Sequence, residues 1–185
     1  MSTAGLLRSA YLIYLSQPAA DRSLYRALKG RTIRSLVEFG IGSGERTGRL
    51  LEVAAWEPAT QPLQYTGIDL FEQRPKDRPG LTLKAAFAKL KFANVKVRLV
   101  PGDPYSALAR IANQTSGVDV AVISADQDRE SLERAWFYLP RMLHTDSLIF
   151  VEEPDPKGVT QYRTLKLHDI ERLATAAGRA MRRAA

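Results

Sequence analysis

Hydrophobic residues recur at helical intervals in two segments near the start of the chain. The apolar positions of these segments are Leu7, Ala10, Tyr11 and Tyr14 and, after Pro18, Leu24, Ala27 and Leu28. We therefore expect two helices within residues 1–32, packed on a domain that covers residues 33–185.

From Ser35 onward, short apolar runs alternate with amphipathic stretches. The runs predict strands at 36–39, 63–70, 95–100, 118–124 and 148–152. The stretches predict one helix that starts at Glu45 and ends at Glu57-Pro58. They predict further helices at 83–90, 105–112 and 128–143. Such alternation requires crossover connections, which give a parallel sheet with helices on both faces. The fold class expected is α/β, a three-layer αβα sandwich with a doubly wound, mostly parallel sheet.

The pattern weakens after Glu153. A helical stripe made by Ile170, Leu173, Ala174 and Ala177 leads to Gly178. Residues 179–184 could continue this helix or form a short sixth strand at the edge of the sheet.

Composition excludes several kinds of site. The chain has no Cys and only two His, His144 and His168, which excludes thiolate catalysis and Cys-ligated zinc and disfavours a His-rich metal centre. We expect no bound metal. The apolar run at 10–15 is too short for a membrane helix, and we expect a cytoplasmic protein without a membrane partner.

Positive charge is concentrated in two parts of the chain. The net charge is +7, and residues 72–98 and 157–185 hold eight and seven Lys or Arg against two acids each. Such segments can attract an acidic substrate, RNA or an anionic surface, or they can simply be solvated.

The sequence Glu38-Phe39-Gly40-Ile41-Gly42-Ser43-Gly44 lies between the first expected strand and its helix. Glycines there allow positive φ angles and close approach of a ligand, although strand-to-helix packing alone could require them. The dinucleotide fingerprint needs a third Gly where this chain has Glu45, so an NAD site is disfavoured.

Carboxylates follow the next two strands. Asp69, before Leu70, ends the second strand, and Asp103, before Pro104, follows the third. In a parallel sheet these ends share one edge, where the first acid can accept hydrogen bonds from ribose hydroxyls and the second from an adenine amine. Either acid could instead cap a helix or form a turn.

These features together resemble the class I S-adenosylmethionine-dependent methyltransferases over residues 33 to about 153. The resemblance implies the strand order 3-2-1-4-5 and S-adenosyl-L-methionine as the cofactor. It implies that Glu38 and the turn Gly40, Ile41, Gly42 and Gly44 hold the methionine part. It assigns the ribose to Asp69 with Leu70, and the adenine to Asp103 with Pro104.

The end of the fourth strand, Ser124-Ala125-Asp126, is similar to a subset that includes small-molecule O-methyltransferases. The resemblance places Ser124 and Ala125 at the cofactor. Metal-dependent members have an acid where this chain has Ser124 and an Asp-Asn pair where it has Glu152-Glu153, so the metal set is incomplete. Asp126, Asp128, Glu152 and Glu153 could converge on one side of the cofactor pocket, where Asp126 is a candidate general base. Alternatively, Asp126 or Asp128 could cap the next helix and the glutamates could be exposed.

The leading hypothesis is a methyltransferase acting on an oxygen or nitrogen atom of a small or acidic acceptor. Two alternatives stay open. One is a non-catalytic module that binds S-adenosylmethionine or a nucleotide, and the other is an RNA-modifying methyltransferase. A homodimer also stays open, because the short C-terminal segment leaves room for a second subunit at the acceptor site.

Overall fold

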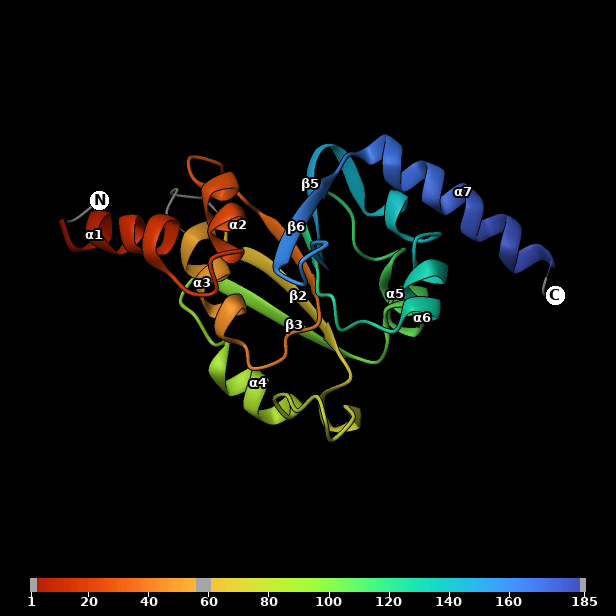
Figure 1. Cartoon of the computed structure of the whole chain (residues 1–185), viewed down its shortest axis with the longest axis horizontal. Helices are drawn as coiled ribbons and strands as arrows, with labels where there is room; N and C mark the ends of the chain where they lie inside the picture. Colours follow the sequence, from red (N-terminus) through yellow and green to blue (C-terminus); the bar gives the residue numbers. More distant parts are fainter. Residues whose placement is uncertain (1–2, 56–60, 184–185) are drawn as a thin grey trace.

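The computed structural model describes residues 3–55 and 61–183, in which a six-stranded sheet lies between two layers of helices (Figure 1). The strands are β1 (Ser35–Phe39), β2 (Leu63–Asp69), β3 (Val95–Pro101), β4 (Val118–Ile123), β5 (Leu143–Pro154) and β6 (Thr160–Leu165). Their order is β3-β2-β1-β4-β5-β6. All neighbours are parallel except β5 and β6. The predicted fold class and the order 3-2-1-4-5 are confirmed.

The helices divide between the two faces of the sheet. One face carries the π-helical turn η1 (Tyr11–Leu15), α2 (Asp21–Leu28), α3 (Glu45–Ala54) and α4 (Leu83–Lys89). The other carries α5 (Pro104–Ile111), α6 (Arg129–Ala135) and α7 (Leu167–Arg183). The first helix, α1 (Thr3–Ala10), precedes η1 and is joined to α3 by the ion pair of Arg8 and Glu52 at 2.9 Å. Short 3-10 turns lie at η2 (Phe71–Gln73) and η3 (Leu139–Arg141). The two expected N-terminal helices are thus present, the first continuing into η1.

The central strand β1 is buried on both faces, as expected for a parallel sheet covered by two helix layers. Leu36 packs into the core beneath α3, while Val37 and Phe39 pack into the core beneath α5. Glu38, the residue between Val37 and Phe39 in this strand, is 0% exposed. A carboxylate in this position must be paired inside the protein.

The C-terminal part departs from the prediction. Residues 179–183 continue α7, so a sixth strand there is wrong over these residues; residue 184 lies outside the described part. The sixth strand is instead β6, which forms an antiparallel hairpin with β5. Its turn is closed by Asp155, whose side chain accepts hydrogen bonds from the backbone of Lys157 and Val159 at 2.8 Å. Gly178 does not end α7, and a Cβ atom there would lie 3.3 Å from the ring of Phe137.

Other boundaries differ by a few residues. The helix expected at 128–143 stops at Ala135, η3 follows, and β5 starts at Leu143 instead of residue 148. The helix end expected at Glu57-Pro58 falls outside the described residues. Within the described ranges, none of the helices has the length and apolar character that a membrane crossing needs.

Candidate functional site

The carboxyl ends of the four central parallel strands lie side by side along one edge of the sheet. Backbone hydrogen bonds extend the alignment past the strands: Gly40 N–H donates to Ile68 at 2.8 Å, and Ser124 N–H donates to Phe39 at 2.9 Å. Gly102 N–H donates to the backbone carbonyl oxygen of Asp69 at 2.9 Å. The structure therefore brings the glycine turn and the loops that follow β2, β3 and β4 together.

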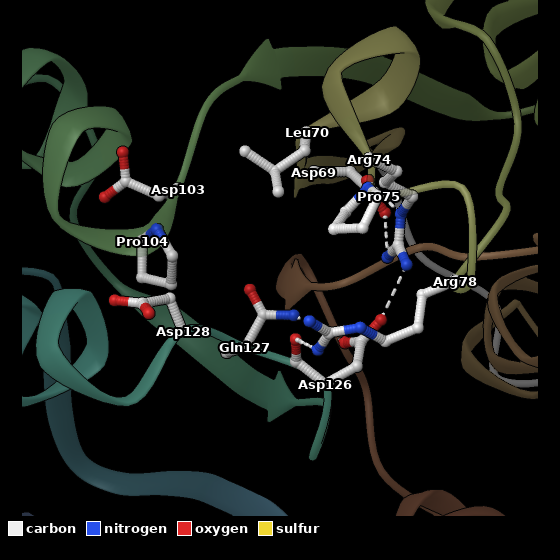
Figure 2. Close-up of a pocket in the computed structure, with 10 residues that line it drawn as sticks. All are labelled: Asp69, Leu70, Arg74, Pro75, Arg78, Asp103, Pro104, Asp126, Gln127 and Asp128. Atoms are coloured by element: carbon white, nitrogen blue, oxygen red, sulfur yellow. Dashed lines mark hydrogen bonds and ion pairs between the residues drawn. The ribbon is translucent and has the colours of Figure 1, made fainter.

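Two cavities open at this edge. The first, of about 210 Å³, is lined by residues that include Asp69, Leu70, Arg74, Asp103, Pro104 and Asp126 (Figure 2). The second, of about 250 Å³, lies against the glycine turn, and its lining includes Asp21, Gly40, Ile41, Gly42, Ser124 and Asp126. Asp126 borders both. Nine of the predicted site residues therefore line one or both cavities, while Glu38, Gly44 and Ala125 line neither.

The three glycines of the turn have positive φ angles, but their surroundings differ. A Cβ atom on Gly42 would meet nothing within 4 Å, so this part of the turn is open to a ligand. A Cβ on Gly40 would lie 2.7 Å from the Ser124 side chain, because the loop after β4 packs against it. A Cβ on Gly44 would lie 2.9 Å from Leu81, on another side of the turn.

Asp69, the predicted ribose ligand, is already fully hydrogen-bonded. Its Oδ2 accepts from the backbone N–H groups of Ile41 at 2.7 Å and Gly42 at 3.0 Å, and its Oδ1 accepts from Phe71 at 3.0 Å. Arg74 adds one bond to each oxygen, at 2.5 and 2.7 Å. Burial alone would raise the pKa of Asp69, but these bonds lower it below its ordinary value. The residue thus shapes the glycine turn and binds Arg74.

Asp103, the predicted adenine ligand, is the N-cap of α5. Its Oδ1 accepts from the N–H groups of Tyr105 and Ser106, both at 3.1 Å, and from the Ser131 hydroxyl. Its Oδ2 accepts from the Ser106 hydroxyl at 2.5 Å. Burial opposes ionisation, yet the hydroxyl bonds lower the pKa of Asp103 to about 2. Asp103 lines the first cavity (Figure 2), but its charge is committed to the start of α5.

Glu38 lies behind the glycine turn. It accepts hydrogen bonds from Arg46 at 2.9 Å, Thr47 at 2.7 Å and Tyr65 at 2.9 Å. Burial and the Glu38 charge raise the pKa of Tyr65 well above its ordinary value, so Tyr65 stays a donor. Arg46, which lines the second cavity, also donates to Glu152 at 3.0 Å and to the Gly40 carbonyl at 2.7 Å. Glu38 does not line the second cavity itself, but it holds Arg46, which does.

The carboxylates expected near the fourth and fifth strands do not converge. Glu152 lines the second cavity and accepts from the Ser124 hydroxyl at 2.8 Å. Glu153 pairs instead with Arg163 at 3.0 Å, and Asp128 caps α6 by accepting from Ser131 N–H at 2.7 Å. Asp126, the candidate base, pairs with Arg74 at 2.6 Å. Of these four acids, Glu152 and Asp126 therefore line the second cavity, and Glu153 and Asp128 do not.

Sequence reasoning missed several residues that line the cavities, among them Asp21, Arg46 and Arg74. Asp21 is 3% exposed and accepts hydrogen bonds from two tyrosine hydroxyls, Tyr162 at 3.1 Å and Tyr25 at 3.4 Å. Burial raises its pKa above the ordinary value. One signal was available for Arg46, because a cation in the first turn of a helix opposes the helix dipole and calls for another partner.

No protein-family model matches the sequence, and no curated protein sequence matches it. Solved structures do match. A TehB-like SAM-dependent methyltransferase from Corynebacterium glutamicum is 17% identical, with a TM-score of 0.50 over 94% of this chain and 79% of that protein. A precorrin-6y C5,15-methyltransferase from Geobacter metallireducens is 13% identical, with a TM-score of 0.53 over 89% and 72%. The resemblance seen in the sequence is therefore confirmed at the level of architecture: this chain has the class I S-adenosylmethionine-dependent methyltransferase fold.

Proposed function

We propose that the chain is an S-adenosylmethionine-dependent methyltransferase that acts on an oxygen or nitrogen atom of a small acceptor. The observation that carries the proposal is the open space beside Gly42, where a ligand can approach the backbone of the glycine turn. The fold supports it, because similar solved structures are methyltransferases.

The residues around the two cavities fit an adenosyl cofactor in space. Each cavity alone is smaller than the usual range for ligand sites, about 300–1,000 Å³, but the two together reach it. The first would hold the nucleoside near Asp69, Leu70 and Pro104, and the second would hold the methionine part near Gly42. One group must move for a ribose to bind, because Arg74 occupies Asp69.

S-adenosylmethionine, when bound, supplies a methyl group on a sulfonium whose leaving group is already activated. The chain must then position the acceptor and take its proton. Asp126 is engaged on both oxygens, by Gln127 at 2.7 Å and Arg74 at 2.6 Å. Among the described residues, the hydrogen-bond partners of Asp21 are two hydroxyl groups, and burial raises its pKa, which suits a carboxylate that receives a proton. We therefore propose Asp21, in addition to Asp126, as a proton acceptor.

The charges of the second cavity bear on the acceptor. Four carboxylates line it against two guanidinium groups, and one of the latter, Arg46, is already paired with Glu38 and Glu152. Such a lining attracts cations and repels anions. We propose an uncharged or amine acceptor in place of the acidic one that the basic segments suggested.

Calorimetric titration with S-adenosylmethionine, S-adenosylhomocysteine and NAD tests the cofactor. We expect binding of both sulfur ligands and not of NAD. In urea denaturation, either sulfur ligand at a concentration one hundred times its dissociation constant should raise the free energy of unfolding by about 2.7 kcal/mol. Gly42→Ala should weaken binding about tenfold or more, because its methyl group fills the open space.

Gly117→Ala is the matched control. Gly117 also has a positive φ angle and open space around its Cα, but it precedes β4 at the opposite edge of the sheet. The same backbone strain there should leave affinity unchanged. No binding of either sulfur ligand by the wild-type chain would reject the proposed cofactor.

A second candidate function is the non-catalytic module. The observation that favours it is that Asp126, the predicted base, has both carboxylate oxygens engaged, by Gln127 at 2.7 Å and Arg74 at 2.6 Å, which hinders it from taking a proton from an acceptor. Release of S-adenosylhomocysteine in the presence of small phenols and amines separates the two candidates. A chain that binds the cofactor but gives no turnover with any acceptor of this panel would favour the module.

A further inference from the structure

The hydrogen-bonding capacity of Asp69 is exhausted by the protein itself. A carboxylate offers about four lone-pair sites, and five N–H groups donate to Asp69. Three of them are backbone groups of Ile41, Gly42 and Phe71, and the other two belong to Arg74. A ribose hydroxyl therefore finds no free acceptor on Asp69 while Arg74 remains in place.

Arg74 is the partner that can leave. The backbone donors are fixed by the glycine turn and by the start of η2, whereas Arg74 lies just after η2 in a polar segment, residues 74–80, that contains Pro75 and Pro79. Its side chain can rotate without breaking the sheet. When Arg74 departs, Oδ1 of Asp69 keeps only the Phe71 N–H and gains room for a ligand hydroxyl.

Asp126 gives the departing guanidinium a second anchor. Arg74 Nη1 lies 2.6 Å from Asp126 Oδ2, and the Asp126 side chain is 28% exposed against 2% for Asp69. Figure 2 shows Arg74 between the two acids, at the side of the first cavity. Arg74 can therefore release Asp69 while its positive charge stays paired with Asp126.

Gly80 supplies the space that Arg74 occupies. A Cβ atom on Gly80 would lie 2.6 Å from Cδ and 2.9 Å from Nε of Arg74, and 3.2 Å from the Gly42 carbonyl oxygen. Gly80 has no positive φ angle, so its backbone accepts alanine. Gly80→Ala would thus push the Arg74 side chain away from Asp69 without removing its charge.

We propose that Arg74 gates the nucleoside site, so that a ribose binds Asp69 only after Arg74 has given up Asp69 and is held by Asp126 alone. The inference rests on the proposed function, since it concerns the same cavity. It makes Arg74 a determinant of affinity for any ligand that presents a vicinal diol at Asp69. The unliganded chain is then mostly closed, and its apparent affinity is reduced by the fraction of molecules that are open.

Calorimetric titration with S-adenosylhomocysteine tests the gate in four proteins: wild type, Arg74→Met, Gly80→Ala and the control Lys76→Met. Lys76 is exposed in the same segment, so its variant removes one charge without touching Asp69. We expect Arg74→Met to bind about tenfold more tightly than wild type if the closed form outnumbers the open form by about ten to one. Gly80→Ala should also bind more tightly, and Lys76→Met should bind like wild type.

Adenosine and 2′,3′-dideoxyadenosine identify the hydroxyl groups as the cause. The gain in Arg74→Met should be larger for adenosine, because only its hydroxyls can use the freed oxygen of Asp69. Thermal unfolding of each variant verifies that it is folded, and Gly80→Ala provides the test if Arg74→Met is not.

The outcomes separate the gate from the proposed function. Wild-type binding together with equal or weaker binding by Arg74→Met overturns the gate and leaves the cofactor assignment standing. Opposite signs for Arg74→Met and Gly80→Ala also overturn it. Failure of all four proteins to bind S-adenosylhomocysteine rejects the cofactor and the gate together.

Discussion

Two clusters, each made of one arginine and two acids, contact the glycine turn, and they differ in how their arginine is held. The inner cluster is Glu38, Arg46 and Glu152, and the outer cluster is Asp69, Arg74 and Asp126. In each, one guanidinium bridges two carboxylates. Arg46 belongs to the first turn of α3, whereas Arg74 belongs to an irregular segment between η2 and α4.

The inner cluster joins more of the structure. Glu38 is also bound by Thr47 of α3 and Tyr65 of β2, and Arg46 reaches Tyr162 of β6 at 3.1 Å. The arginine therefore links strands that come from both ends of the chain. In the outer cluster, Arg74 can leave Asp69 with its backbone bonds intact. An ion triad therefore stabilises the fold where regular elements hold every member, whereas a triad whose arginine comes from a loop can open, as the proposed gate requires.

The largest effect is expected from Arg46→Ala. It leaves Glu38 buried at 0% exposure without its cation, which should lower the free energy of unfolding by about 3–5 kcal/mol. Urea denaturation measures this loss. Arg129→Ala is the control, because its pair with Glu133 is exposed, at 92% and 61%, and should change stability by less than about 1 kcal/mol. A similar small loss in both variants would contradict a structural role for the inner cluster.

Arg74→Met should cost less stability, about 1–3 kcal/mol, because Asp69 keeps its three backbone donors. The pKa of Asp69 is lowered in the folded chain, so its contribution is present above the ordinary value of 3.8 and is lost as the pH falls below it. The gap between wild type and Arg74→Met should therefore narrow from pH 7 to pH 3. Urea denaturation at both pH values checks this, and a loss as large as that of Arg46→Ala would make the two clusters equivalent.

The sequence was sufficient to predict the strands, the glycine turn and the two acids of this site, but not strand β6 or the partners of the two arginines. The alternation of apolar runs and the glycines at 40–44 are local signals, and the parallel order then sets Asp69 and Asp103 on one edge. Strand β6 escaped prediction because it is a largely exposed edge strand without an apolar run. The partners of the arginines were hidden by distance along the chain, because Arg74 and Asp126 are 52 positions apart and Arg46 and Glu152 are 106 positions apart.

Asp103 belongs to neither cluster and provides a third case, an acid without an arginine partner among the described residues. N–H and hydroxyl groups satisfy its carboxylate instead. Asp103→Ala removes the cap of α5 and should cost about 0.5–2 kcal/mol, whereas Asp103→Asn can still cap and should cost less. The pKa of Asp103 is about 2 in the folded chain against an ordinary 3.8, so its charge stabilises the fold above about pH 4 and ceases to do so as the pH falls through 2. Thermal unfolding of the three proteins between pH 7 and pH 2 should show wild type and Asp103→Asn converging in acid. If Asp103→Ala is as stable as wild type but binds S-adenosylhomocysteine more weakly, the acid serves the ligand and not the helix.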